Sequence, residues 1–283
     1  MKRHITDIIL IIVLLAGISL LLYPTVSEYV NSKHQSKVIH SYNDQVEKMD
    51  EDSFKKWFDE ADDYNRRLNE TAGAFYKPQK VSGYEDTLNF IGDGVIGYVS
   101  IDKINVELPI YHSTEPEVLQ FAAGHLEGTS LPVGGEGTHS VLVAHRGLPS
   151  ARLFTDLDEL ETGDIFTITV LNRVMTYEID QILTVLPEEV KELQTQEGKD
   201  FCTLLTCTPY GINTHRLLVR GKRIENSEEK EALIVVNEAF KVDPLIVAPV
   251  VAAPMILIFV IVVIFSGRGK KKLRKEGVKK NES

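Results

Sequence analysis

A cysteine lies where an apolar run meets a turn, in the stretch TLLTCTPYGINTHRLLVRG that covers residues 203–221. Cys207 ends a Val/Leu/Thr-rich run, and the Pro-Tyr-Gly sequence that soon follows interrupts a β-ladder and permits a turn. The thiol is therefore expected at the mouth of a strand. It is either a small core residue or a nucleophile, and a nucleophilic thiol needs a base and often a fixed cation beside it.

Eight histidines could supply the base, and two of them are the main candidates. His145 ends the run HSVLVAH and so also emerges at a strand mouth, whereas His215 is nearest to Cys207 in sequence. Alternation opposes His215, because it shares a strand face with Leu217 while Arg216 lies on the other, more polar face. Arg216 is then expected beside Cys207, directly or diagonally across an antiparallel pair. The alternative is a core thiol, a histidine with ordinary partners and a surface arginine.

The second cysteine, Cys202, precedes Cys207 by five residues in the same apolar run. Its opposite parity places it in the core. Extended chain separates the two Cα atoms by about 16 Å, well beyond the ~7 Å that a disulfide can bridge. If the run is one strand, both thiols are free, and a free thiol outside the cytoplasm favours a use for it.

Short runs with two-residue alternation begin near residue 91 and predict eight strands. The runs are 95–101, 106–111, 139–145, 165–170, 174–180, 181–186, 201–207 and 215–224. Only brief helical pieces, at 115–122 and 151–157, interrupt them. Many short strands separated by turns favour a closed or nearly closed barrel, so the fold class is expected to be mainly β, with the barrel over residues 91–225.

Residues 24–90 are expected to form a helical stalk and a connecting loop. Apolar residues recur at steps of three and four between residues 36 and 68, with a new N-cap near Asp52 and Ser53. The stalk helices are expected to pack on the barrel, and the loop near 70–93 joins the two.

Two long apolar runs, 7–23 and 245–266, are each about long enough to cross a membrane. No small-x-small cleavage site follows the first run, which favours a retained anchor over a cleaved signal peptide. Basic residues in the start 1–6 and in the tail 267–283 place both termini in the cytoplasm. The barrel and the tether 226–244 are then extracytoplasmic.

The net charge is −10, and the basic residues are concentrated at the two ends of the chain. The stretch between the apolar runs is therefore more acidic than the whole, which argues against a nucleic-acid partner. No set of residues has convincing spacing for a metal site, and no cofactor is expected.

Several of these motifs resemble those of sortases, the membrane-anchored cysteine transpeptidases of Gram-positive bacteria. The sequence TLLTC with an arginine nine residues later resembles the sortase signature TLxTC. The block at 124–160, GHLEGTSLPVGGEGTHSVLVAHRGLPSARLFTDLDEL, and the second apolar run look like the class C, pilus-assembling subfamily. The resemblance covers about residues 91–224. It implies an eight-stranded sortase barrel in which Cys207, His145 and Arg216 are catalytic.

The implied reaction is acyl transfer at an LPxTG-type sorting signal. Cys207 would attack the Thr-Gly carbonyl, His145 would protonate the leaving amine, and Arg216 would hold the substrate and the developing oxyanion. In this subfamily a lysine of the next pilin then resolves the thioester. Three other functions remain open: attachment of surface proteins to a peptidoglycan cross-bridge amine, hydrolysis by a cysteine peptidase, and a non-catalytic anchored barrel that binds partners.

One segment departs from the subfamily pattern. Class C sortases commonly carry a lid with an Asp-Pro-aromatic motif, and no such motif occurs in NETAGAFYKPQKVSGYEDTLNF, residues 69–90. The sequence FYKP at 75–78 lacks the aspartate. The segment is therefore expected to be an ordinary connecting loop.

Overall fold

The computed structural model describes residues 2–226, with side chains described from residue 9 onward. The chain divides into two units, Met1–Glu231 and Ala232–Ser283. The second unit lies outside the described residues, and with it the predicted membrane helix at 245–266, the basic tail and almost all of the tether.

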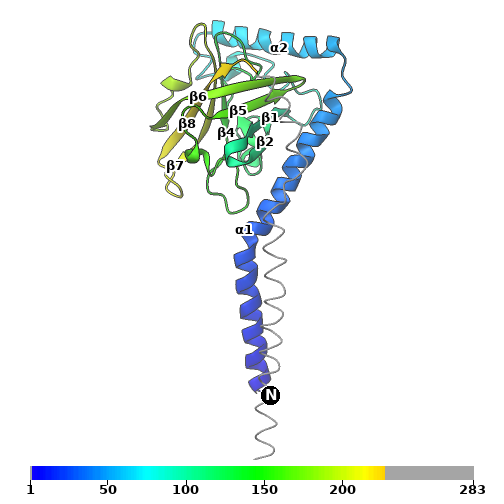
Figure 1. The fold of residues 1–283 in the computed structure, drawn as a ribbon, viewed down its shortest axis with the longest axis vertical. Coiled ribbons are helices and arrows are strands. Elements are labelled where there is room, and N and C mark those ends of the chain that lie inside the picture. The colour runs from blue at the N-terminus through cyan, green and yellow to red at the C-terminus, as the bar shows by residue number, and fades with distance from the viewer. Residues whose placement is uncertain (1, 227–283) are drawn as a thin grey trace, which may run out of the picture. The chain divides into compact units, whose positions relative to one another are not determined.

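Eight strands close into a barrel in the order β1-β2-β3-β4-β7-β8-β6-β5 (Figure 1). Their bounds are β1 Val95–Ile101, β2 Val106–His112, β3 Ala123–His125, β4 Thr138–Val143, β5 Ile165–Val170, β6 Arg173–Val185, β7 Asp200–Thr208 and β8 His215–Ile224. Neighbouring strands are antiparallel except β2–β3 and β4–β7, which are parallel. The predicted fold class, a mainly β closed barrel of eight strands, is confirmed.

The strand count is correct although two of the predicted strands were wrong. The runs at 174–180 and 181–186 form the single strand β6, whose pairing with β8 shifts register between Ile179 and Gln181. A β-bulge shifts which side chains face the core. The apolar alternation on either side of it is therefore out of phase, and one continuous strand looks like two in the sequence. The eighth strand is β3, which sequence reasoning missed because three residues carry no measurable alternation.

The helical pieces within the barrel were predicted with mixed success. A one-turn helix, α3 Pro116–Leu119, occupies the first predicted piece. The piece at 151–157 is not a helix: Ala151 forms an isolated bridge with Leu148, turns follow, and a 3-10 helix, η3, begins at Leu157 and ends at Glu159. Three further 3-10 turns are η1 Pro78–Lys80, η2 Asp102–Ile104 and η4 Lys191–Leu193.

The N-terminal region forms two helices, α1 Lys2–Val46 and α2 Glu51–Glu70. Helix α1 runs continuously through Pro24, and its stretch Ile9–Val46 is long and apolar enough to cross a membrane. Its C-terminal part contacts the barrel through Tyr42, whose hydroxyl donates to the Ile96 carbonyl and accepts from the Leu171 amide, both at 2.8 Å. The first apolar helix is consistent with a membrane anchor.

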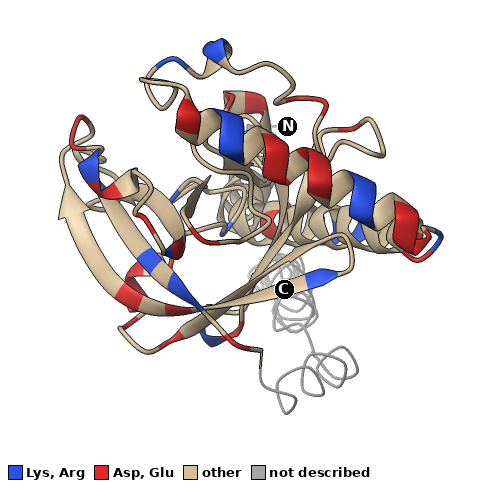
Figure 2. Ribbon diagram, turned by 90° about the horizontal axis from the view of Figure 1, so that it is seen from above, with Lys and Arg blue, Asp and Glu red and all other residues tan. Residues whose placement is uncertain are grey.

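Helix α2 lies across one end of the barrel, at the top of Figure 1. Asp50 caps it by accepting a hydrogen bond from the Ser53 amide, so the helix begins slightly earlier than the N-cap expected near Asp52. Its apolar face is buried, and Asn65 exchanges two hydrogen bonds with the Leu131 main chain at 3.2 and 2.7 Å. Both acidic and basic residues are distributed along it (Figure 2).

Candidate active site

The mouth of the barrel beside the β7–β8 turn brings Cys207 and Arg216 together. The two residues are cross-strand partners in the antiparallel β7–β8 pair, and Thr208 pairs with His215 one step nearer the turn. Directly paired residues lie on the same face of a sheet, with Cβ atoms about 5 Å apart. Arg216 is therefore the direct neighbour of the thiol, as alternation predicted.

The two cysteines face opposite sides of the barrel wall. Cys202 is fully buried in the barrel core, and this burial raises the pKa of its thiol well above the ordinary value. Cys207 is half-buried on the outer face, and both thiols are free. A buried thiol that stays protonated is a poor nucleophile, so only Cys207 is placed to react.

His145 lies beyond the end of β4, the strand that runs parallel to β7. The pairing ends with Val143 opposite Leu205, and the Ala144 amide still donates to the Leu205 carbonyl at 3.2 Å. If the pairing of Val143 with Leu205 is continued for two more residues, His145 lies opposite Cys207. Partial burial lowers the pKa of the imidazole below its ordinary value, which favours the neutral form at neutral pH.

The competing histidine, His215, lies on the other face. It pairs with Thr208, which has the opposite orientation to Cys207, and its Nδ1 atom is 2.9 Å from the Thr214 hydroxyl. The pairing therefore puts Cys207 and Arg216 on one face and His215 on the other, and the β4–β7 offset sets His145 level with Cys207.

The charge of Arg216 is not neutralised within the described part of the chain. Its Nη1 atom donates to the main-chain carbonyls of Asn213 at 3.3 Å and of His215 at 3.1 Å, and no carboxylate among residues 9–226 pairs with it. Arg220, on the same strand face, instead makes two hydrogen bonds to Asp180 at 2.9 and 2.8 Å. The Arg216 guanidinium keeps N–H groups for a ligand beside the thiol.

Three other histidines are buried and engaged in the fold. His112 has a carbonyl oxygen at each ring nitrogen, His125 contacts Tyr84 and Ser130, and His139 contacts Gln194 and Thr203. Burial lowers the pKa of each imidazole, that of His125 to about 3. The ring nitrogens of all three are engaged within the fold, so these histidines are not candidates for the base.

An apolar surface that sequence reasoning missed continues from Cys207 along the outer face. We call it the outer cluster: Val141, Leu193 and Leu218 are buried in it, and Phe75, Leu126, Val143, Leu183, Val185, Val190 and Leu205 pack against it. Leu205 and Leu218 are cross-strand partners two residues from the Cys207–Arg216 pair. Buried residues on the outside of a barrel wall indicate that other segments cover that face.

Two loops provide this cover. The β6–β7 loop contributes Leu193, and the Gln194 carbonyl accepts a hydrogen bond of 3.0 Å from His139. The segment after α2 contributes Phe75, and its neighbour Tyr76 accepts a hydrogen bond from the Gln194 amide at 3.1 Å. The segment expected to be a plain connecting loop is thus packed on the face that carries the candidate site.

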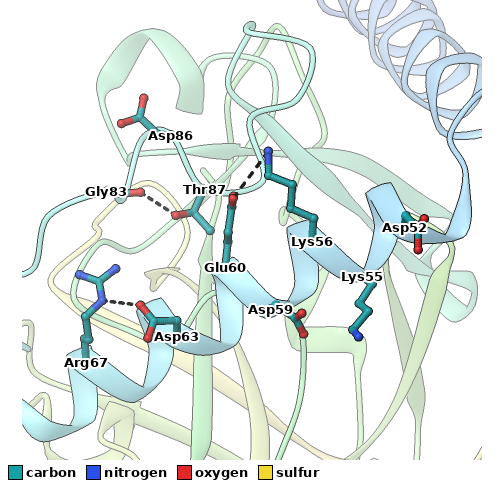
Figure 3. A pocket seen from close by; sticks show the side chains of 10 residues that line it. All are labelled: Asp52, Lys55, Lys56, Asp59, Glu60, Asp63, Arg67, Gly83, Asp86 and Thr87. Atoms are coloured by element: carbon teal, nitrogen blue, oxygen red, sulfur yellow. Dashed lines mark hydrogen bonds and ion pairs between the residues drawn. The ribbon is translucent and has the colours of Figure 1, made fainter.

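A hollow of about 570 Å³ along α2 is a different feature (Figure 3). Charged side chains line it, and they pair with one another: Arg67 with Asp63 at 2.8 Å and Lys56 with Glu60 at 3.9 Å. None of the three predicted site residues lines this hollow, and its groups do not converge on a common point. Among the described residues there is also no group of three or more His, Cys, Asp or Glu side chains that could hold a metal ion.

Comparison with known proteins matches the Sortase domain family over residues 99–224. The crystal structure of sortase C1 from Streptococcus agalactiae is 48% identical, covers 68% of this chain and all of that chain, and superposes with a TM-score of 0.62. The chain belongs to the sortase family. The resemblance found in the sequence is therefore confirmed, and sortases are cysteine transpeptidases.

Further relatives of this sortase include class C members from a second genus. The sortase C of Clostridium perfringens, in a structure with the C-terminal cell wall sorting motif, is 42% identical over 68% of this chain and all of that chain, with a TM-score of 0.59. Sortase A from Bacillus anthracis is 27% identical over 81% of this chain and 99% of that protein. The match to Sortase A of Streptococcus agalactiae, at 30% identity, spans 52% of this chain and 60% of that protein.

Proposed function

We propose that this sortase polymerises pilins. It would cleave an LPxTG-type sorting signal between Thr and Gly through a thioester on Cys207, and transfer the acyl group to a pilin lysine. The observation that carries this proposal is the pairing of Cys207 with the unneutralised Arg216, with His145 at the same level of the barrel. The class C neighbours support the pilin substrate, because one of them is described in terms of pilin substrate specificity.

The first step forms the thioester. The Cys207 proton moves to His145, and the resulting thiolate attacks the Thr-Gly carbonyl carbon. Arg216 donates hydrogen bonds to the oxygen on which negative charge develops; a guanidinium suits this role because it remains charged and donates in a planar fork. The imidazolium of His145 then gives its proton to the leaving glycine amine as the C–N bond breaks.

The second step transfers the acyl group. A lysine amine attacks the thioester carbonyl, neutral His145 accepts a proton from it, and the Cys207 thiolate leaves and regains a proton. Partial burial of His145 favours the neutral ring that this step requires. The product is an isopeptide bond between two subunits.

The outer cluster supports an apolar substrate at this site. Its partly exposed members, among them Val143 and Leu205, lie near Cys207 and would give apolar residues of a sorting signal apolar partners there. The N-terminal apolar helix supports a membrane location. We further propose the two-pass topology, with both termini in the cytoplasm and the barrel outside.

The acceptor amine separates the main proposal from its alternative. Purified full-length protein in detergent micelles would receive a sorting-motif peptide together with either a pilin domain or a cross-bridge amine. A covalent product with the pilin domain alone supports polymerisation; a product with the cross-bridge amine alone favours attachment to the cell wall. Hydrolysis with every amine would contradict transpeptidation.

A non-catalytic binding barrel is the remaining alternative. It predicts that Cys207→Ala leaves function intact and that iodoacetamide does not modify Cys207. The half-buried thiol should instead be alkylated while the fully buried Cys202 is not.

A further inference from the structure

Two side-chain hydrogen bonds join the β4 and β7 segments, one on each side of the His145–Cys207 pair. On one side the Thr206 hydroxyl donates to the Ala144 carbonyl at 2.8 Å, and on the other Arg146 Nη1 donates to the Thr208 hydroxyl at 3.2 Å. Both bridges join residues 62 apart, which is the offset of the parallel β4–β7 pairing. His145 and Cys207 are the intervening pair at the same offset.

The regular pairing has ended before this point. Its last residues are Val143 and Leu205, followed only by the Ala144 amide bond to the Leu205 carbonyl. Beyond it, the only hydrogen bonds between the two chain segments in the described residues are the two side-chain bonds, Thr206 to the Ala144 carbonyl and Arg146 to Thr208. The spacing between the base and the thiol therefore depends on side chains and not on a β-ladder.

The Arg146 side chain is largely buried and does not lie on the protein surface. Its side chain is 9% exposed, Nη2 donates to Asp158 at 2.5 Å, and the guanidinium carbon is 6.0 Å from the centre of the Tyr210 ring. One guanidinium thus joins the residue after His145, the residue after Cys207, the β7–β8 turn and the η3 segment.

The Arg146 guanidinium is also incompletely satisfied, because its Nε–H is buried without a partner among the described residues. A buried unpaired donor weakens folding, and surface ion pairs add little stability. The neighbouring Arg152, paired with Asp156, is 51% exposed and makes no bond to β7. Burial of Arg146 with an unpaired donor is hard to explain as stabilisation alone.

The β7–β8 turn contacts the same loop at a second point. Gly147 has φ +76°, and a Cβ atom there would lie 2.8 Å from the Tyr210 ring. The Gly147 amide donates to the Thr155 hydroxyl at 3.1 Å. The loop that follows β4 and carries His145, here called the His145 loop, is therefore contacted by the β7–β8 turn and by Thr155. The absence of a side chain at Gly147 allows the turn to approach this loop.

We propose that Arg146 is a positioning residue that holds His145 at the working distance from Cys207 by tying the His145 loop to Thr208 and Asp158. This inference rests on the proposed roles of His145 and Cys207. It adds that Arg146 acts on the chemical step and not on peptide binding.

The test compares Arg146→Met, Arg146→Lys and Thr208→Val in full-length protein, with Arg152→Met as the matched control. Cleavage of a quenched fluorescent peptide carrying an LPxTG-type sequence gives kcat and KM. We expect Arg146→Met to lower kcat roughly ten- to hundredfold while KM changes by less than about twofold, because misplacement of about 1 Å costs on this scale. Arg146→Lys should recover part of kcat, and Arg152→Met should retain it.

A second measurement needs no substrate. The rate of Cys207 alkylation by iodoacetamide is measured across pH with and without His145→Ala, first in the wild type and then in each variant. If Arg146 positions His145, the effect of His145→Ala on this profile becomes smaller in Arg146→Met and in Thr208→Val. A wild type that alkylates in this coupled way but cleaves no peptide would refute the proposed function and leave the positioning role standing.

Two outcomes would overturn the inference. One is a folded Arg146→Met protein whose kcat stays within about twofold of the wild type, which the positioning argument excludes. The other is a loss of kcat with undiminished coupling between His145 and Cys207, since Arg146 would then act elsewhere. If Arg146→Met does not fold, Arg146→Lys and Thr208→Val decide the question by the same two measurements.

Discussion

Acidification should destabilise this sortase through His125, a fully buried histidine in β3. Its Nε2 lies 2.8 Å from the Ser130 carbonyl, to which it donates, and its Nδ1 lies 2.9 Å from the Tyr84 hydroxyl. Burial lowers the pKa of the imidazole to about 3. The unfolded chain binds a proton at a pKa of about 6.5, so the folded state loses stability as pH falls from about 6.5 towards 3.

The size of the effect follows from the two pKa values. Each pH unit between them costs about 1.4 kcal/mol, so lowering the pH from about 7 to about 4.5 should remove about 3 kcal/mol through this residue. A domain is typically stable by about 5–15 kcal/mol, which makes the loss easy to measure. Urea unfolding of the full chain in detergent micelles can be followed by Trp57, the single tryptophan, which packs against Phe90.

The decisive comparison is His125→Gln, which keeps a donor and an acceptor but cannot titrate. Its unfolding free energy should fall by about 3 kcal/mol less than that of the wild type over the same pH change. Tyr84→Phe is the control: it removes the hydrogen bond between the Tyr84 hydroxyl and His125 Nδ1, lowers stability at both pH values and keeps the pH dependence, because the imidazole stays buried. Equal pH dependence in His125→Gln and the wild type would refute the reasoning.

Three further predictions concern the site, the barrel and the topology. Arg216→Gln should lower kcat for peptide cleavage by about 10²–10³ while Arg220→Gln changes it little, since Arg220 is bonded to Asp180; equal losses in a kinetic assay would contradict this. Gly221→Ala should lower the unfolding free energy by about 1–3 kcal/mol, because the new Cβ would lie 2.5 Å from an aromatic ring; an unchanged urea midpoint would count against it. In a Cys207→Ala background, Asn281→Cys should resist an impermeant maleimide in intact cells and react after lysis, and labelling of intact cells would place the tail outside.

Local alternation was enough to predict which side chains share a face. Cys202 and Cys207 lie five positions apart in one strand, an odd offset, so their opposite orientations follow from the sequence alone. The same rule separated His215 from Arg216. Period-two alternation is a property of each strand and needs no knowledge of its neighbours.

The neighbours themselves could not be read from the sequence by these means. His145 stands level with Cys207 because β4 pairs in parallel with β7, a strand that follows it only after two others. The short strand β3 and the bulge in β6 are set by pairing across the barrel. The packing of Phe75 was missed for a similar reason: it is partly buried against residues far along the chain.

The continuous course of α1 was also beyond local signals. Pro24 separates the apolar run from the amphipathic part, and the two were expected as separate segments. Proline is tolerated in membrane helices, so the helix can continue across it. The sequence pattern predicted an apolar segment and an amphipathic segment, but not that they form one continuous helix.

The central claim is that Cys207 carries the acyl group. Incubation of the full-length protein with an LPxTG-type peptide, rapid acid quenching and intact-mass analysis would detect the acyl-enzyme, and peptide mapping would locate it. The account predicts an adduct on Cys207 that hydroxylamine releases, and none in Cys207→Ala. An adduct on another residue, or undiminished cleavage by Cys207→Ala, would contradict it.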